Sequence, residues 1–185
     1  PTPVALTASP ARDDGAAMAR TVYTTQHLTA WGSMVSGYLV TKAVAAGVML
    51  VASLLVLLGH GDSRAAVGIV PPMLAGVFLA LTGVLLIADL KQPKRFMYLL
   101  TRGNRTSWLV KGAYVLGGFA ACLAVWWMVG LVDADGLLPV LVLPTVLLAL
   151  ATAGYTAFLF GQCEGRDLWQ EPLLLPILLA QAVVA

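Results

Sequence analysis

The chain has 185 residues, of which 59% are hydrophobic and only 11% are charged. Soluble globular domains carry about 25% charged residues, so this composition has too few polar side chains to cover a protein surrounded by water. The formal net charge of +2 is too small to indicate a nucleic-acid-binding protein. The composition therefore predicts an integral membrane protein whose main solvent is the lipid bilayer.

Long apolar segments recur along the chain. A helix needs ~20 apolar residues to cross the hydrocarbon core of a bilayer, and four segments reach that length: 34–58, 67–88, 108–132 and 137–160. A fifth apolar segment covers 173–185. Spanning strands would alternate in polarity, whereas these segments are apolar throughout. We therefore predict an all-α membrane protein, an antiparallel four-helix transmembrane bundle followed by the start of a fifth helix.

The same pattern divides the chain into three parts. A polar amino-terminal segment covers 1–26, the four-helix bundle covers 27–164, and a loop with the start of a second helical bundle covers 165–185. The last apolar segment reaches Ala185 without a cap or a polar flank. From this we expect the chain to be part of a longer polypeptide.

Basic residues gather in one loop, between the second and third apolar segments. This loop contains Lys91, Lys94, Arg95, Arg102 and Arg105, whereas the neighbouring loops contain Asp62 with Arg64 and Asp133 with Asp135. Because basic loops are retained in the cytoplasm, the pattern places the amino terminus and the basic loop there. A basic loop that docks a partner subunit would also be retained on the far side, so the opposite orientation stays open.

Antiparallel helices bring most of the unusual polar residues to the same side of the membrane. The residues that meet there are His27, Tyr38, Lys42, Asp89, Lys111, Tyr114, Tyr155, Gln162 and Glu164. Ionisable residues within membrane segments are costly and usually functional. This side of the bundle is therefore the predicted site.

Lys42 is the most unusual of these residues. It follows Met34 by eight residues, which places it about 12 Å deep at the helical rise and near the limit from which a lysine reaches the interface. Its ammonium group either reaches the membrane interface or forms an ion pair with an acidic side chain. Asp89 is a plausible partner, because a carboxylate at a helix C-terminus faces the negative end of the dipole and needs a cation nearby. Lys42, Arg95 or Lys111 could supply that cation. A structural salt bridge and a proton-handling role are equal alternatives.

The residues available for cofactor binding exclude a haem held by two histidines of this chain. His27 and His60 are 33 residues apart, about 50 Å along a helix. The two cysteines, Cys122 and Cys163, cannot supply the four thiolates of an iron–sulfur cluster, and we interpret them as free thiols. We expect no haem, iron–sulfur cluster or metal site in this chain, and any redox carrier has to be soluble in lipid.

Three segments resemble the NrfD and polysulfide reductase membrane-subunit family. The first is DLKQPKRF at 89–96, followed by Ser107, Trp108 and Gly112 at the start of the next helix. The second is YLVTKAVAAG at 38–47, and the third is YTAFLFGQCEGRDLWQEPLLLP at 155–176. The resemblance covers residues 27–185 and keeps the three segments in the family's order.

Several expectations follow from this resemblance. Members of the family contain eight or more helices in bundles of four and exchange electrons between a quinone in the bilayer and a ferredoxin-like iron–sulfur subunit, often with a molybdopterin subunit beyond it. The chain is then the quinone-reactive subunit of a respiratory oxidoreductase complex, not catalytic alone, in the cytoplasmic (inner) membrane of a prokaryote. The quinone is menaquinone or ubiquinone. Some relatives are thought to couple electron transfer to proton movement.

The resemblance and the converging polar residues together suggest roles for individual side chains. The candidates for the quinone pocket are His27, Tyr38, Lys42, Asp89, Arg95, Lys111 and Tyr155. Asp89 and Glu164 are the candidates for proton exchange. The chain departs from the family pattern at Lys91 and Gln92, where Gly-Arg is usual, and at Lys42 and Lys111, which add cations within helices. The outline of the pocket is therefore left open.

Two other functions fit parts of the pattern. In a secondary transporter, Lys42, Asp89 and Lys111 would bind an ion or an anionic solute. Transporters usually have discontinuous helices and inverted repeats, and the sequence shows neither. In a purely structural anchor, the basic loop would hold a peripheral enzyme at the membrane, and no quinone would bind.

Overall fold

The computed structural model describes residues 33–60, 63–89, 106–162 and 171–184, all of which belong to the unit Trp31–Ala185. Every regular element among these residues is a helix. The five α-helices are α1 (Ser33–Leu57), α2 (Val70–Asp89), α4 (Trp108–Leu131), α5 (Leu138–Gly161) and α6 (Leu174–Val184). A π-helical turn, Arg64–Ile69, leads into α2, and a short 3-10 turn, Asp135–Leu137, leads into α5.

The predicted transmembrane helices are confirmed. Four of the described helices are long and apolar enough to cross a membrane: α1, the continuous run Arg64–Asp89, α4 and α5. The shorter apolar helix α6 follows them. Helices form because a chain in lipid has to satisfy its backbone hydrogen bonds within each segment.

The second span begins earlier than the sequence pattern indicated, at Arg64 rather than at residue 67. Ser63 caps its start, since the Oγ atom of Ser63 accepts a bond from the N–H of Ala66 at 3.4 Å. The N–H of Val70 bonds to the carbonyl of Ala65, five residues back, which is the π-helical pattern. Pro71 and Pro72 follow in the first turn of α2, where the absence of their N–H groups is tolerated.

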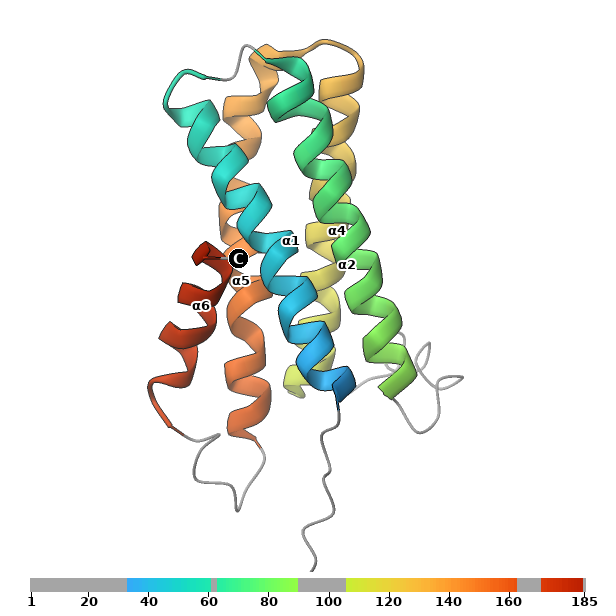
Figure 1. Ribbon diagram of the computed structural model, residues 1–185, viewed down its shortest axis with the longest axis vertical. Helices are drawn as coiled ribbons and strands as arrows, with labels where there is room; N and C mark the ends of the chain where they lie inside the picture. Colours follow the sequence, from blue (N-terminus) through green and yellow to red (C-terminus); the bar gives the residue numbers. More distant parts are fainter. Residues whose placement is uncertain (1–32, 61–62, 90–105, 163–170, 185) are drawn as a thin grey trace, which may run out of the picture. The chain divides into compact units, whose positions relative to one another are not determined.

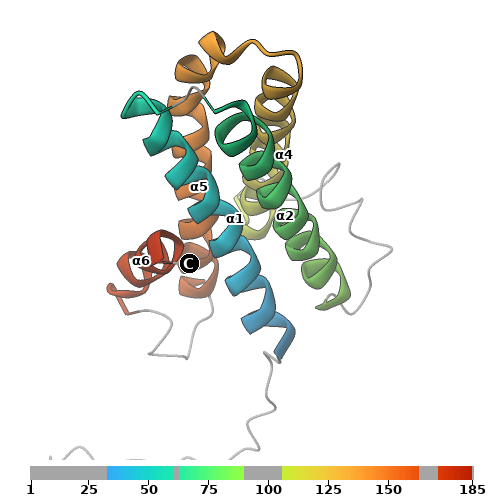
Figure 2. The same cartoon turned by 45° about the horizontal axis from the view of Figure 1, so that its top comes forward.

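Consecutive long helices run antiparallel and pack side by side (Figure 1). Helix α1 packs most extensively against α2 and also against α5, while α4 packs against α5 and less closely against α2. Helix α6 lies against both α5 and α1, as the tilted view in Figure 2 also shows. We call the end of the bundle where α1 and α4 begin the site end, and the other the far end.

Small residues allow the closest approaches between helices, as expected where packing rather than hydrophobic burial joins helices in lipid. Three buried alanines of α1, Ala43, Ala45 and Ala46, belong to the main core with Met49 and Phe119. At the far end, a Cβ atom on Gly130 of α4 would overlap with the backbone of Gly68 in the π-helical turn. Glycine is therefore required at this crossing.

Two polar contacts fasten the far end. The indole Nε1 of Trp126, a fully buried residue, donates a hydrogen bond to the carbonyl of Val67 at 3.0 Å. The guanidinium of Arg64 donates to the carbonyls of Gly130, at 2.7 Å from Nε, and of Leu131. These carbonyls end α4 and have no partner in the next helical turn. At the far end, hydrogen bonds thus join the start of the second span to the end of α4.

Candidate functional site

The site end contains a buried lysine inside the membrane span. Lys42 of α1 is only 1% exposed. Its Nζ donates hydrogen bonds to the carbonyl of Ala153, at 3.1 Å, and to the hydroxyl of Thr156, both on α5. The same Nζ lies 4.8 Å from the ring centroid of Tyr155, within the range of a cation–π contact. Lys42 therefore joins α1 to α5 through neutral and aromatic groups.

Two tyrosines are buried beside this lysine, Tyr38 one turn earlier on α1 and Tyr155 on α5. Tyr155 occupies space that a side chain at residue 112 would need, because a Cβ atom on Gly112 of α4 would overlap with the tyrosine ring. Tyr38 packs in a small cluster with Val35 and Phe160. Gly112 thus allows α4 to approach Tyr155 closely.

A second polar contact links α1 to α2 at this level. The hydroxyls of Thr41 and Thr82 are 2.7 Å apart, and Thr82 also donates to the carbonyl of Phe78 at 2.8 Å. Both threonines are buried. Thr41, Thr82 and Thr156 were not predicted as site residues, because threonine is common in membrane helices and only its contacts distinguish these three.

The structure brings three predicted site residues together and separates two others from them. Tyr38, Lys42 and Tyr155 are buried side by side, whereas Lys111 and Asp89 are exposed. The Nζ of Lys111 lies 4.4 Å from the ring centroid of Trp108. The remaining candidates, His27, Arg95 and Glu164, lie outside the described residues.

The suggested ion pair between Lys42 and Asp89 is wrong. Lys42 hydrogen-bonds to α5, while Asp89 ends α2 with an exposed side chain. Within the described residues, the recorded salt bridge joins Arg64 to Asp133 at the far end, with 3.9 Å between Nε and Oδ1. Lys42 also does not reach the interface, because its bonds hold it inside the bundle.

A pocket of about 420 Å³ opens between the start of α4, the end of α5 and the start of α6. Its polar lining residues are Gln162 and Glu171, and its aromatic wall is formed by Trp108 and Phe158. These two rings stack with their centroids 4.5 Å apart. Gln162 fixes the start of α4 by accepting a hydrogen bond from the backbone N–H of Trp108 at 3.3 Å. Phe158 and Glu171 carried no signal in the sequence.

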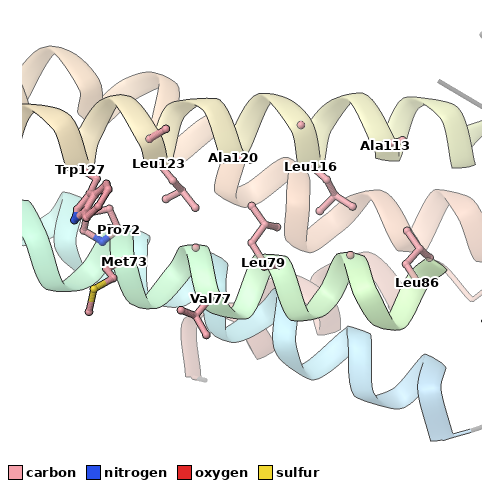
Figure 3. Close-up of a pocket in the computed structure, with 15 residues that line it drawn as sticks. Pro72, Met73, Val77, Leu79, Leu86, Ala113, Leu116, Ala120, Leu123 and Trp127 are labelled. Carbon is pink, nitrogen blue, oxygen red and sulfur yellow. The ribbon is translucent and has the colours of Figure 1, made fainter. Parts of the chain in front are cut away.

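A larger groove, of about 700 Å³, runs between α2 and α4 (Figure 3). Fifteen residues line the groove, and about half of them are glycine or alanine. All fifteen are apolar apart from the indole N–H of Trp127. The small lining residues are Gly76, Ala80, Gly83, Ala113, Gly117, Ala120 and Ala124. Trp127 lies near one end of the groove, while Leu86 and Ala113 lie near the other (Figure 3). The Leu86 end is one helical turn from Asp89.

Metal-ligating side chains do not gather in the part of the chain that the structure describes, where no group of three or more His, Cys, Asp or Glu residues could hold an ion. Cys122 is a free thiol whose Sγ lies 3.1 Å from the hydroxyl of Thr145. Cys163 lies outside the described residues. The expected absence of haem and iron–sulfur clusters stays a prediction.

Four spanning helices around a buried lysine and two buried tyrosines define a multi-pass helical membrane protein with a polar site inside its bundle. Comparison with known families shows which family of membrane proteins this chain belongs to. The family model described as polysulphide reductase, NrfD, matches residues 21–185. None of the curated proteins matches the chain significantly.

Because this match covers most of the chain, the protein belongs to the NrfD family. It is a multi-pass prokaryotic membrane subunit of a polysulphide reductase-type complex. The resemblance carried by the segments at 38–47, 89–96 and 155–176 is confirmed. The roles of individual residues in binding a quinone stay predictions.

Proposed function

We propose that this chain is the membrane subunit through which a respiratory oxidoreductase exchanges electrons between a quinone or quinol in the bilayer and an iron–sulfur partner subunit. One observation carries the proposal. Lys42, Tyr38 and Tyr155 are buried together inside the span of an NrfD-family chain. Polar groups that are this expensive to bury in a membrane are expected to serve a function.

The chemistry of a quinone headgroup suits these side chains. Its two carbonyl oxygens accept hydrogen bonds, which an ammonium or a phenolic hydroxyl donates. Donors of this kind also stabilise the negative charge that develops when the ring accepts electrons. Lys42 and Tyr155, which approach each other across α1 and α5, are therefore the proposed headgroup contacts, with Tyr38 beside them.

Reduction of a quinone consumes two protons with two electrons, so the site also needs groups that exchange protons with water. Asp89 meets this requirement because it ends α2 at the site end with an exposed side chain. We assign proton exchange to Asp89, together with Glu164. His27, Arg95 and Lys111 complete the proposed surroundings of the headgroup.

The groove between α2 and α4 offers a place for the isoprenoid tail. From Pro72 to Leu86 it follows fourteen residues of α2, about 21 Å at the helical rise. Its volume of about 700 Å³ and its apolar lining suit a hydrocarbon chain that lies along the two helices.

The electrons have to leave or enter through a partner, because we expect no redox cofactor in this chain. A ferredoxin-like iron–sulfur subunit, with a molybdopterin subunit beyond it, is the proposed partner on the site end of the bundle. The basic loop that would dock it lies outside the described residues. Partners of this kind agree with membership of a polysulphide reductase-type complex.

The transporter alternative has less support. Its three ion-binding candidates do not meet, since Lys42 is buried against α5 while Asp89 and Lys111 are exposed. The described spans continue without the mid-membrane breaks that transporters use, and the one irregular turn, Arg64–Ile69, lies at the start of its span. Lys42, Asp89 and Lys111 therefore do not form one ion-binding site.

Purification of the complex in mild detergent tests the proposal. We expect mass spectrometry to find an iron–sulfur subunit among the co-purifying proteins and a quinone among the extracted lipids. Added quinol should then reduce the iron–sulfur clusters, which is visible in their absorption or electron paramagnetic resonance spectra. A single polypeptide without quinone or partner would contradict the proposal and favour the transporter.

A further inference from the structure

Buried hydroxyl groups continue from Lys42 towards the far end along the interface between α1 and α5. We call these residues the hydroxyl seam: Lys42 and Ser53 on α1, with Thr152 and Thr156 on α5. Each is at most 1% exposed. Ser53 follows Lys42 by eleven residues, about three helical turns and about 16 Å, so both lie on the same side of α1. Thr145, further along α5, lies instead 3.1 Å from Cys122 of α4 and is not part of the seam.

Two members of the seam have no hydrogen-bond partner among the described residues, the Oγ of Ser53 and the Oγ1 of Thr152. Leaving a buried hydroxyl unpaired costs about 1 to 3 kcal/mol, and internal water commonly removes that cost in proteins. Buried threonines elsewhere are paired, as Thr41 is with Thr82. The unpaired hydroxyls therefore indicate that water enters this particular interface.

Lys42 is suited to pass a proton to such water. The hydroxyl of Thr156 can accept a hydrogen bond from an ammonium or donate one to an amine, so the contact between Lys42 and Thr156 persists in both protonation states. The titratable group that faces Lys42 from α5 is Tyr155. Its neighbour on α1 is Tyr38, α2 presents only the hydroxyl of Thr82 at this level, and α6 contains no ionisable residue.

Helix α6 packs against α5 beside this part of the seam. An added Cβ atom on Gly154 of α5 would lie 2.9 Å from the side chain of Leu175. Gly154 adjoins Ala153, whose carbonyl binds Lys42. Lys42 is thus buried between α1 and α5, and the buried polar groups that follow Thr156 towards the far end are those of the seam.

We infer that Lys42 passes protons between the quinone end and a water-filled path along the hydroxyl seam, which leads towards the far end of the bundle. The inference rests on the proposed quinone chemistry. Oxidation of one quinol releases two electrons, which pass to the iron–sulfur partner, and two protons. The Lys42 amine accepts one of these protons and becomes an ammonium, which gives that proton to water at Thr152, while the other proton leaves to water through Asp89 at the site end. Quinone reduction runs the same steps in reverse.

The complete complex in liposomes tests this path, with quinol oxidation and proton movement measured in the same vesicles. The test variants are Thr152→Val and Ser53→Ala, which remove the unpaired hydroxyls without changing the proposed headgroup contacts. Thr41→Val is the matched control, because it removes a buried hydroxyl that lies at the α1–α2 contact. We expect the protons moved per electron to fall at least about two-fold in the test variants, since a methyl group cannot relay a proton, and to stay unchanged in the control.

The outcomes separate the two claims. Unchanged proton movement in Thr152→Val and Ser53→Ala, with normal quinol oxidation, would overturn the path and leave the proposed function standing. A wild-type complex that does not oxidise quinol would overturn both. If a test variant fails to assemble, two other experiments take its place: the Thr152→Ser variant, which keeps a hydroxyl, and a high-resolution density map of the wild-type complex. The serine variant should move protons normally, and the map should show water within about 3 Å of both hydroxyls; a dry seam would contradict the path.

Discussion

The two ends of the bundle each bind a cation to backbone carbonyls, but they do so for different reasons. At the far end, Arg64 bonds to the last carbonyls of α4 and lies 3.9 Å from Asp133. Its side chain is 42% exposed. A cation at a helix C-terminus with a carboxylate nearby satisfies the carbonyls and the dipole at once. Arg64 is therefore explained by the fold alone.

Lys42 has no such explanation. It is 1% exposed, bonds to the middle of α5 and has no carboxylate partner among the described residues. Placing a cation there is expensive, and a well-packed apolar residue would often be at least as stable. The difference between the two ends indicates that function, rather than stability, accounts for Lys42.

The largest effect is expected for Lys42→Met, which keeps the length of the side chain and removes its charge and hydrogen bonds. Quinol-dependent electron transfer should fall about 100-fold, the lower range for losing a proton-transfer group, while the complex still assembles. The measurement is the rate of cluster reduction by quinol. Arg64→Met, which removes a cation from the far end of the bundle, is the control. Full activity of Lys42→Met would favour a purely structural anchor.

The next effect is on stability at the site end. In Gly112→Ala, the added methyl group overlaps with the ring of Tyr155, and overpacking of this kind costs about 1 to 3 kcal/mol. We expect a lower thermal unfolding temperature in detergent and weaker quinol binding. Gly117→Ala on the same helix is the control, because a Cβ atom there would meet nothing within 4 Å. Equal stability of the two variants would show that α4 does not press on Tyr155.

A smaller effect is expected in the groove between α2 and α4. Ala120→Leu fills part of the groove, whereas Ala121→Leu places the same side chain on an exposed position of α4 outside the lining. We expect Ala120→Leu to raise KM about five-fold for a long-tailed quinol, or about 1 kcal/mol of lost binding, and to leave KM for a tail-less quinol unchanged. Equal effects on both substrates would exclude the groove as the tail site.

The smallest effect is expected at the far end. Arg64→Met removes the hydrogen bonds to Gly130 and Leu131, and each bond of this kind contributes about 1 kcal/mol. Thermal stability should decrease slightly, while quinol oxidation should be unchanged. A loss of activity larger than the loss of stability would show that the far end takes part in function directly.

Most of the fold was predictable from the sequence, because an unbroken apolar segment of spanning length has few alternatives in lipid. The antiparallel order also predicted that Tyr38, Lys42 and Tyr155 would share one end of the bundle. The rotation of α1 about its axis was not predictable, because α1 is apolar on all sides and its pattern indicates no face. For this reason the sequence suggests Asp89 as a partner of Lys42 and gives no sign of Ala153 or Thr156, which bind it.

The two cavities escaped sequence analysis for a related reason. The groove is lined by glycine and alanine at positions such as Gly76 and Gly117, and such residues are common on every face of a membrane helix. The unpaired hydroxyls of Ser53 and Thr152 became visible only when the neighbours of each side chain were known. Sequence patterns give the depth of a residue in the membrane, whereas contacts decide its role.

Cross-linking by a photoreactive quinone in the intact complex tests the central claim most directly. After illumination, mass spectrometry would identify the labelled peptides of this chain. We predict labels at the site end, on α1 near Tyr38 and Lys42 and on α5 near Tyr155, and expect excess unlabelled quinol to prevent them. Labels at the far end near Arg64, or labels that quinol does not displace, would contradict a quinone site around Lys42.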